Sequence, residues 1–538
     1  MSVFSKFMKV LATGAAALLF VACGGNGSKV SQADENNMIP DNAVCAVKVD
    51  LKSLWEKTSG DPGSQVRQLT AMAKMFLPSV IEENLESDAL ADIANEFLSD
   101  PATLGIALDK PAVMSAAFDV VSYEYDEYTA QACLTVLLND SEAFNKVADE
   151  VLVMAREEGL PGTSKTVVDD DYTHYIYVAD DGAALDLGVG AKSAVLRLVY
   201  DPELVDYQKT MVNLFAKGGP KKTDGLKAFN AADEDVALWL DLNTTLTEVM
   251  EIVKEEERSL YAQLQPMMDL YEGSSVTATL NFEDGKTVMH VNVYGNEAMA
   301  SYNDKYYAQA SDKYFESVPE SSVFVANLAI KDVAGMLEEM AKSNPDFEEL
   351  LPMLEEVGID EDILKGLPGQ ITLALDGKGI DTKEIPGFVA VMECEPEVYA
   401  LVESYLEEYA DLYDDVYVID GLCAITYTDG ALYAVESGLA ASGYYHFNSE
   451  YADVIEKGGL VIDLEQLPKH LLDEFAQEID YSMSGNDLLE YVNALTVAVD
   501  APLSTTVTLY MADKDHNLLE KLGDLLAGEV MKEVRASF

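Results

Sequence analysis

Positive charge is scarce in this chain. Its 538 residues include 35 Lys and Arg against 96 Asp and Glu, which gives a formal net charge of −61. So acidic a surface repels the phosphates of nucleic acids and of anionic lipid headgroups, and nucleic acid is not an expected partner. The acids are spread along segments with the apolar patterning of a folded protein. This distribution favours a solvated surface over a store for cations.

Cysteine and histidine are also few, at five residues each. They are scattered, with no CxxC, no HExxH and no His/Cys pair at zinc-ligand spacing, so we expect no metal site and no cofactor. One cysteine, Cys23, is set apart by its position at the end of the apolar run discussed below. The remaining four would allow three pairings in an exported protein, but buried free thiols are the favoured interpretation. These four are Cys45, Cys133, Cys394 and Cys423.

Motifs for catalysis and for phosphate binding are missing as well. There is no GxSxG nucleophile elbow and no GxxxxGK[ST] loop. The stretch 376–381 only superficially resembles an EF-hand loop, because Lys378 stands where an oxygen ligand is needed. A pair of carboxylates for glycoside cleavage stays open, since 96 acids make some pair inevitable.

One long apolar stretch is present, at residues 11–22, behind the positive charges of Lys6 and Lys9. As a helix it would span roughly 18 Å, well short of a hydrocarbon core of ~30 Å. It ends in Leu19-Phe20-Val21-Ala22-Cys23, which resembles a bacterial lipobox. We therefore predict a lipoprotein signal peptide over residues 1–22; the alternative is an uncleaved anchor.

The residue after this stretch, Cys23, is the predicted lipid attachment site, so the expected partner is a membrane reached through that lipid. Residues 23–37 are rich in Gly, Ser, Asn and acids and cannot bury a core. They read as a flexible tether. No later run approaches ~18 apolar residues, so no further span is expected.

The order of predicted elements recurs along the chain. Both parts open with a turn, a strand and a helix start, and later each contains a helix ending in Lys-Gly-Gly followed by an apolar strand. The opening matches are Pro40 with Pro319, Val44 with Val323, and Lys52 with Lys331. We interpret this as an internal duplication with an N-terminal half at 38–316 and a C-terminal half at 317–538. The alternative is the succession that any α+β protein shows.

The fold class predicted for both halves is α+β. Each half is expected to hold a mainly antiparallel sheet packed by amphipathic helices, because short strand patterns alternate with 3.6-residue periodicity and Asp-Gly turn signals such as Asp429-Gly430 favour tight hairpins.

The lipobox cysteine Cys23, the polar tether and the opening over 39–54 together resemble a Bacteroidota family of envelope lipoproteins described as a domain of unknown function. The resemblance implies an outer-membrane lipoprotein and brings no active site with it. Acids that direct export to the cell surface usually follow the lipid cysteine closely, whereas here Asp34 and Glu35 lie farther away. A periplasm-facing orientation is therefore favoured over the cell surface.

Two groups of tyrosines beside acids are the weak candidates for ligand binding, because aromatic faces next to carboxylates can hold sugars or cationic groups. These candidates are Tyr123, Tyr125, Tyr172 and Tyr175. Packing in strands is the favoured reading of all four. A further set at steps of about four is predicted to form a helix stripe that faces the core. This set is Tyr399, Tyr405, Tyr409 and Tyr413.

Together these features favour a non-enzymatic protein with a binding or structural role, with a glycan or a peptide as the expected ligand. The alternative is an envelope hydrolase that uses a carboxylate pair. Catalytic residues are not predicted.

Overall fold

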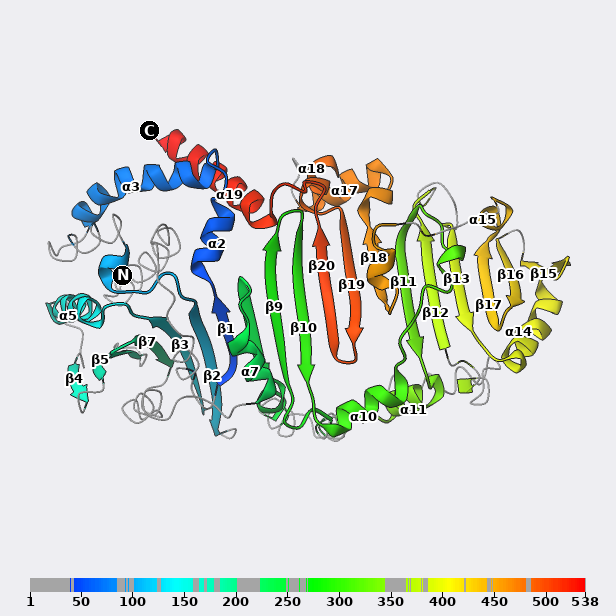
Figure 1. Ribbon diagram of the computed structural model, residues 1–538, viewed down its shortest axis with the longest axis horizontal. Coiled ribbons are helices and arrows are strands. Elements are labelled where there is room, and N and C mark those ends of the chain that lie inside the picture. The colour runs from blue at the N-terminus through cyan, green and yellow to red at the C-terminus, as the bar shows by residue number, and fades with distance from the viewer. Residues whose placement is uncertain are drawn as a thin grey trace. The chain divides into compact units, whose positions relative to one another are not determined.

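The computed structural model describes residues 39, 43–84, 92, 95, 101–122, 127–157, 164–168, 172–178, 184–200, 223–247, 250, 261, 268, 270–343, 364–365, 367, 369–378, 380, 386–419, 422–442, 447, 449–479 and 485–537. These residues fall into two compact units (Figure 1). Unit 1 draws on Met1–Glu255, Ser275–Phe282 and Leu519–Phe538. Unit 2 draws on Glu256–Ser274 and Glu283–Leu518.

Unit 1 is built on antiparallel strands joined by helices (Figure 1). Its strands pair in the order β9-β8-β1-β2-β3-β7-β6-β5-β4. In chain order its elements are β1 (Ala43–Val49), α2 (Leu51–Thr58), α3 (Gln65–Asn84), η2 (Pro101–Leu104), β2 (Ala112–Ser122), β3 (Glu127–Leu137), α5 (Ser141–Glu157), β4 (Ser164–Val168), β5 (Tyr172–Val178), β6 (Ala184–Gly190), β7 (Ser193–Tyr200), α7 (Asp224–Ala231), β8 (Val236–Asp241), β9 (Ser275–Glu283) and α19 (Leu518–Ser537).

The core of unit 1 has two main clusters. Around β1 and β8, Trp239 and Phe229 are almost fully buried. Around β5, β6 and α5, the central side chain is Tyr175, which is 0% exposed. Alternate residues of these strands point inward, so the apolar pattern that made them read as strands also supplies the core.

The C-terminal helix α19 packs in unit 1 against α2 and α3. Trp55, Val66 and Ala527 form one buried cluster. Asp524 fixes the contact, because its Oδ1 accepts from the Ser64 hydroxyl at 2.7 Å. The last residues of the chain are therefore part of the same compact unit as the first strand.

Unit 2 is also antiparallel. Its strands pair in the order β10-β20-β19-β18-β11-β12-β13-β17-β16-β15-β14. In chain order its elements are β10 (Lys286–Tyr294), α10 (Glu297–Tyr306), η4 (Phe315–Ser317), β11 (Ser322–Ile330), α11 (Val333–Ser343), β12 (Gly369–Asp376), β13 (Phe388–Glu393), α14 (Pro396–Tyr409), β14 (Asp411–Tyr413), β15 (Val416–Ile419), β16 (Cys423–Thr428), β17 (Ala431–Glu436), α15 (Ser437–Ser442), α16 (Ala452–Ile455), β18 (Gly459–Asp463), η5 (Leu464–Gln466), α17 (Lys469–Ile479), α18 (Gly485–Tyr491), β19 (Ala494–Ala501) and β20 (Ser504–Tyr510).

A single large cluster forms the core of unit 2. Val325, Val391 and Ile455 are its fully buried aliphatic centre, and Phe315 meets Phe447 edge-to-face with ring centroids 5.6 Å apart. The turn between β16 and β17 is Asp429-Gly430, with φ of 52° and 78°. Positive φ at both positions is what a tight primed hairpin requires, so the hairpin predicted from this Asp-Gly is confirmed.

The mixed architecture confirms the α+β fold class, with helices and antiparallel sheet in each unit. The unit boundaries differ from the predicted halves in three places: residues 256–274 and residues 283–316, which include β10 and α10, belong to unit 2, and residues 519–538 belong to unit 1. Among the described residues, no helix combines the length and apolar character needed to cross a membrane.

A buried lysine holds the end of helix α7 in unit 1. Lys48 on β1 is 6% exposed. Its Nζ donates to the carbonyls of Phe229 at 2.8 Å and Asn230 at 3.1 Å, and also to that of Ala232. A cation here satisfies the last-turn carbonyls and complements the negative end of the helix.

We expect Lys48→Met to destabilise unit 1 by about 2–3 kcal/mol, because charged hydrogen bonds to buried carbonyls are lost. Both tryptophans of the chain, Trp55 and Trp239, lie in unit 1. Urea unfolding followed by tryptophan fluorescence therefore measures the effect. Lys52→Met is the control: Lys52 is 42% exposed and pairs with Glu56 at 3.9 Å, so its loss should cost under about 1 kcal/mol. Equal costs for the two variants would contradict the capping role.

Candidate functional site

Two of the four tyrosines predicted as ligand candidates are described, and both are buried on β5. Tyr172 is 5% exposed and Tyr175 is 0% exposed. The Tyr175 hydroxyl donates to Asn145 Oδ1 at 2.9 Å. In this structure they are core residues, in agreement with the packing interpretation and not with an open ligand surface.

The other predicted site residues, Tyr123, Tyr125 and the lipid attachment residue Cys23, lie outside the described residues.

A buried charged cluster lies beside these tyrosines, and sequence reasoning missed it. Asp186 on β6 receives two hydrogen bonds from Arg197 on β7, from Nε to Oδ1 at 2.9 Å and from Nη2 to Oδ2 at 2.6 Å. His174 Nε2 lies 3.2 Å from the same Oδ2. Asp186 and Arg197 are 0% exposed and His174 is 1% exposed. The available signal was a single charged residue inside each of two apolar strands.

The cluster is closed to solvent, and both oxygens of Asp186 accept hydrogen bonds from Arg197. A bidentate Arg–carboxylate pair is the strongest arrangement available for burying two charges. Cys133 on β3 lies opposite Arg197, and burial raises its pKa to about 12, more than the nearby Arg197 lowers it. A thiol held protonated in this way is a poor nucleophile. The geometry therefore supports a structural role for this centre.

All four predicted cysteines that follow the tether are free thiols. Cys133 and Cys394 are buried, whereas Cys45 and Cys423 are partly buried. Burial is also the largest cause of a raised pKa at Cys394 and Cys423.

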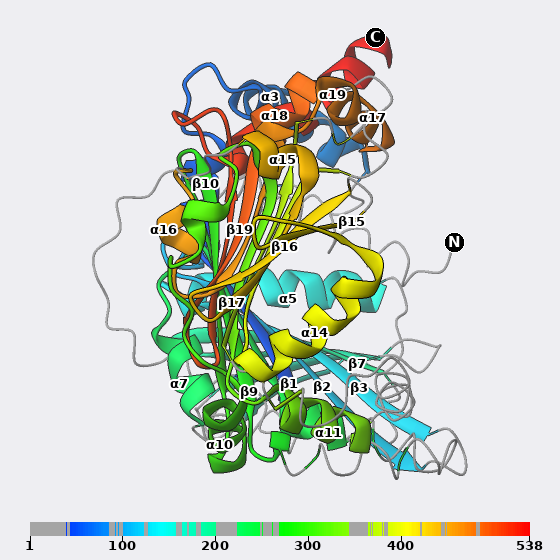
Figure 2. The ribbon, with the colours of Figure 1, turned by 90° about the vertical axis from the view of Figure 1, so that its right-hand side faces the viewer.

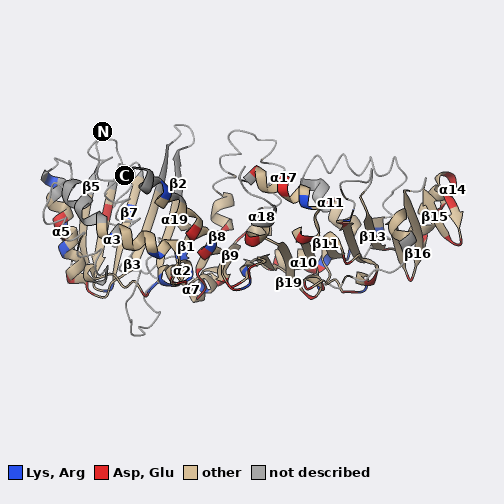
Figure 3. Cartoon of the chain, turned by 90° about the horizontal axis from the view of Figure 1, so that it is seen from above, with Lys and Arg blue, Asp and Glu red and all other residues tan. Residues whose placement is uncertain are grey.

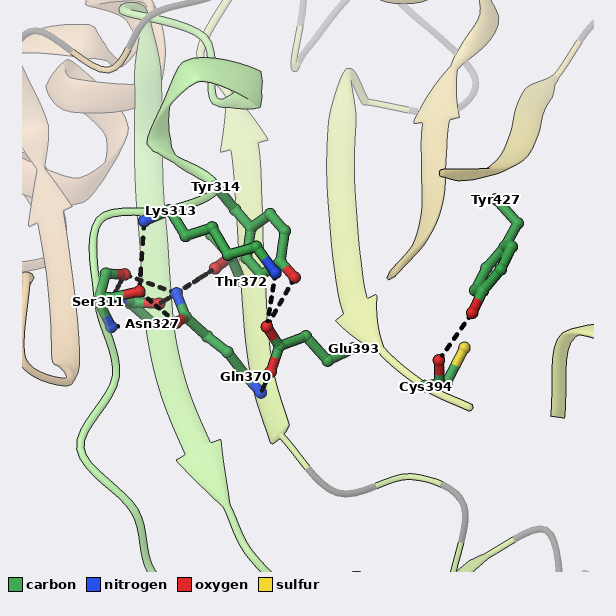
Figure 4. A network of polar contacts seen from close by, with 9 residues as sticks. All are labelled: Ser311, Lys313, Tyr314, Asn327, Gln370, Thr372, Glu393, Cys394 and Tyr427. Carbon is green, nitrogen blue, oxygen red and sulfur yellow. Dashed lines mark hydrogen bonds and ion pairs between the residues drawn. The ribbon is translucent and has the colours of Figure 1, made fainter. Parts of the chain in front are cut away.

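A second polar network lies in unit 2, at the ends of β12 and β13 (Figure 4). Glu393 is its acidic member. Its Oε1 accepts from Lys313 Nζ at 2.9 Å and from the Tyr314 hydroxyl at 2.8 Å, and its Oε2 accepts from the Gln370 backbone N–H at 2.9 Å. Burial alone would raise the pKa of Glu393, but these three donors outweigh it and lower the pKa.

Gln370 and Asn327 carry the network inward. Gln370 Oε1 accepts from the Ser311 N–H at 3.0 Å, and its Nε2 donates to Asn327 Oδ1 at 2.7 Å. Asn327 Nδ2 in turn donates to the carbonyls of Ile455 and Glu456, each at 3.1 Å. Figure 4 shows these side chains converging from β11, β12 and the loop before η4.

This arrangement fixes the protonation states at neutral pH. Burial raises the pKa of Tyr314 to about 12, so its hydroxyl stays a donor, and the lowered pKa keeps Glu393 a carboxylate. Each oxygen of Glu393 already accepts hydrogen bonds from the protein. A carboxylate held in this way positions neighbouring chain segments and has little capacity to accept a substrate proton.

The open surface with aromatic character lies elsewhere, on α14 and the strand after it. We define the α14 stripe as Leu401, Tyr405, Tyr409, Leu412 and Tyr413. Its exposed fractions are 40%, 59%, 61%, 56% and 61% in that order. The Tyr405 and Tyr409 rings lie 5.7 Å apart and 29° from parallel. Exposed apolar patches of this kind mark interaction sites.

The prediction that this tyrosine stripe faces the core is wrong for Tyr405, Tyr409 and Tyr413. The face of α14 that packs inward carries Val398 and Leu406, which are 4% and 5% exposed. Since Leu401, Tyr405 and Tyr409 also lie four residues apart, they share one face, which adjoins the buried one. Tyr413 lies on β14, whose three residues are all exposed.

Exposed carboxylates lie next to residues of the α14 stripe in the sequence. Glu407, Glu408 and Asp411 are exposed neighbours of its rings in the chain. Figure 3 shows acidic residues along α14. Glu403, also on α14, accepts hydrogen bonds from the hydroxyls of Tyr399 at 3.3 Å and Tyr417 at 3.5 Å. Aromatic rings beside carboxylates can bind cations or sugar faces.

No family model matches the chain, and comparisons with curated proteins and with solved structures also found no match. Among the residues that the structure describes, no group of three His, Cys, Asp or Glu side chains could hold a metal ion.

We expect Arg197→Met to destabilise unit 1 by about 3–5 kcal/mol, because Asp186 would remain buried without its partner. The double variant Asp186→Leu/Arg197→Met removes both charges and should recover most of that loss. Tryptophan fluorescence during urea unfolding measures both variants. If the double variant is less stable than Arg197→Met, the cost lies in packing and the buried-charge argument is wrong.

The Glu393 network predicts a pH dependence of stability. A carboxyl whose folded pKa lies below its ordinary value near 4.5 stabilises the fold above that value, and the contribution disappears as pH falls through the lowered folded pKa. Glu393→Gln should therefore lower the urea midpoint at pH about 7, and its difference from wild type should shrink below pH about 4. Circular dichroism measures the midpoints. A difference that is constant with pH would contradict the argument.

Proposed function

We propose that this chain is a lipid-anchored protein of the bacterial cell envelope whose role is binding. The proposed location rests on the basic and apolar segment before Cys23 and on the tether at 23–37. An outer-membrane lipoprotein that faces the periplasm fits the family resemblance. The predicted ligand is a glycan or a peptide.

The observation that carries the binding role is the exposure of the α14 stripe. Water-exposed aromatic side chains with an apolar face gain free energy when a ligand covers them, and Tyr is a frequent anchor in interfaces. Three of its five residues are tyrosines, each more than half exposed. In unit 2 the stripe lies on α14 and the adjoining β14, beside β15 (Figure 2).

A screen of envelope glycans and peptides against the full chain tests this role. We expect a ligand that wild type binds and that Tyr405→Ser/Tyr409→Ser binds at least about tenfold more weakly, since interface tyrosines are frequent hot spots. Tyr307→Ser is the matched control, because Tyr307 is 48% exposed but lies away from α14 in the sequence. Binding that survives the double change would place the ligand elsewhere.

We also infer that the two halves are copies of one ancestral unit. The strand order β9-β8-β1-β2-β3-β7-β6-β5-β4 becomes β19-β18-β11-β12-β13-β17-β16-β15-β14 when ten is added to every label. The agreement covers nine strands and includes two equivalent non-consecutive pairings, β3 with β7 and β13 with β17. It supports common descent more strongly than the succession of elements alone.

Matching residues support the same inference. Lys48 on β1 and Asn327 on β11 follow the matched pair Val44 and Val323 by four positions each. Lys48 donates to carbonyls at the end of α7, before β8, and Asn327 donates to carbonyls at the end of α16, before β18. Two different side chains at equivalent positions of the two halves thus donate to the carbonyls at the end of the equivalent helix.

The pairing of β10 with β20 has the symmetry expected of two copies. Gly285 and Leu503 both have positive φ just before these strands. Val293 and Met511 each lie eight residues further on. The Met511 N–H donates to the Gly285 carbonyl and the Val293 N–H donates to the Leu503 carbonyl, both at 2.9 Å. The two strands therefore use equivalent backbone groups to bind each other, as the two surfaces of an isologous interface do.

For the anchor, we expect Cys23→Ser to abolish lipid attachment, because the predicted acceptor thiol is removed. The exported protein should then stay unprocessed or leave the membrane fraction, since two or more acyl chains on the cysteine are expected to supply the stable attachment. Metabolic lipid labelling with membrane fractionation measures this. Cys423→Ser is the control and should be labelled like wild type. Normal labelling of Cys23→Ser would contradict the anchor.

A further inference from the structure

The segment that carries the α14 stripe differs in charge from the rest of this acidic chain. Residues 384–456 contain 16 Asp and Glu and no Lys or Arg. The whole chain, by contrast, has 35 Lys and Arg for 96 acids. The described part of this segment runs from β13 through α14 to α16. Apart from Lys383 and Lys457, which flank it, the segment has no cation nearby in the sequence to neutralise its acids.

The carboxylates nearest the stripe are solvent-exposed. Glu407 and Glu408 are exposed and directly precede Tyr409, and Asp411 directly precedes Leu412. Asp414 and Asp415, also exposed, form the turn between β14 and β15, with φ of 47° and 68°. Exposed acids are therefore interspersed in the sequence with the second half of the stripe, from Glu407 to Asp415.

We propose that the α14 stripe is a docking surface for a basic amphipathic polypeptide segment, one that carries Lys or Arg beside apolar side chains. Cations of the partner can make two kinds of contact with this surface: they can lie over the exposed tyrosine rings, and they can pair with the nearby carboxylates. Apolar side chains of the partner cover Leu401 and Leu412 at the ends of the stripe. This proposal rests on the binding role proposed above and names its partner class.

A polypeptide fits the surface better than a neutral glycan. Leu401, Tyr405 and Tyr409 follow one another at steps of four along about 12 Å of helix, the spacing at which another helix or an extended strand places its own side chains. The leucines are aliphatic and give no ring on which a sugar can stack. Uncompensated negative charge adds nothing to the binding of a neutral ligand, whereas it accelerates and strengthens the binding of a cationic one.

The test uses the full chain and three probes: a fluorescent Leu/Lys peptide designed as an amphipathic helix, the same peptide with Glu in place of Lys, and a labelled neutral oligosaccharide. Fluorescence anisotropy measures each Kd at low and at physiological salt. We expect binding of the Leu/Lys peptide only, weakened at physiological salt because the charges are exposed.

Two variants and one control separate the contributions. Tyr405→Ser/Tyr409→Ser should weaken Leu/Lys peptide binding by about tenfold or more, and Glu407→Lys/Glu408→Lys should do likewise. Glu316→Lys/Glu320→Lys changes the net charge equally at two exposed acids of unit 2 outside the 384–456 segment, and it should change Kd by less than about twofold. Circular dichroism verifies the fold of each variant.

Three results would overturn the proposal. Equal weakening by the Glu316/Glu320 control would mean that the peptide senses only the overall negative charge. Binding of the oligosaccharide alone, lost in the tyrosine variant, would keep the stripe as a binding site but make the partner class wrong. If no probe and no ligand from the wider screen responds to Tyr405→Ser/Tyr409→Ser, both this inference and the proposed binding role fail.

Discussion

The scarcity of cations is the constraint on which much of this structure depends. With 96 acids and 35 Lys and Arg, most carboxylates have no cation to pair with and must stay in water. Of the buried carboxylates, Asp376 and Asp463 accept hydrogen bonds from uncharged groups. Two others pair with a cation: Asp186 pairs with Arg197, and Asp235, which is 2% exposed, pairs with Lys57 at 2.6 Å. Asp235 also accepts from the Phe282 N–H at 2.7 Å, so this pair joins α2, β8 and β9.

The buried pairs are specific to their places in the fold and are not required by its topology. The β6–β7 and β16–β17 hairpins each have a two-residue turn. Asp186 and Arg197 face each other five residues before and after the first turn, and Ala424 and Val435 do the same at the second turn. Under the proposed duplication, one copy thus keeps a charged pair where the other has small apolar residues. Apolar replacement of a buried pair is often neutral or stabilising, so a sheet of this topology does not need charges at these positions.

The sequence contains enough information to predict the kinds of element and much of their order. Short, nearly continuous apolar runs identify strands such as β11 and β18, and Asp429-Gly430 identifies its hairpin through the backbone freedom that the turn needs. Local chemistry decides these features, so a local pattern is sufficient. The α+β class follows from them.

The face of α14 that is covered could not be predicted in the same way. Val398 and Leu406 are buried, whereas Tyr405 and Tyr409, on an adjoining part of the helix surface, are exposed, so the apolar surface of α14 is wider than the part that is covered. Periodicity shows which residues share a face, but tertiary packing decides which face is buried. The Asp186–Arg197 pair has a similar origin, because it depends on the register between two strands and neither strand shows it alone.

The same excess of acid connects the buried pairs to the surface of the molecule. Cations drawn into the interior, such as Lys48, Lys57 and Arg197, are not available to neutralise the exterior. The 384–456 segment has none of its own, so the sequence around Tyr405 and Tyr409 contributes a negative field. Anionic headgroups are repelled by such a field, and acyl chains at Cys23, as proposed, would attach the protein without any help from surface charge. The exposed α14 stripe then remains available to a partner of opposite charge, and the membrane surface does not compete for it.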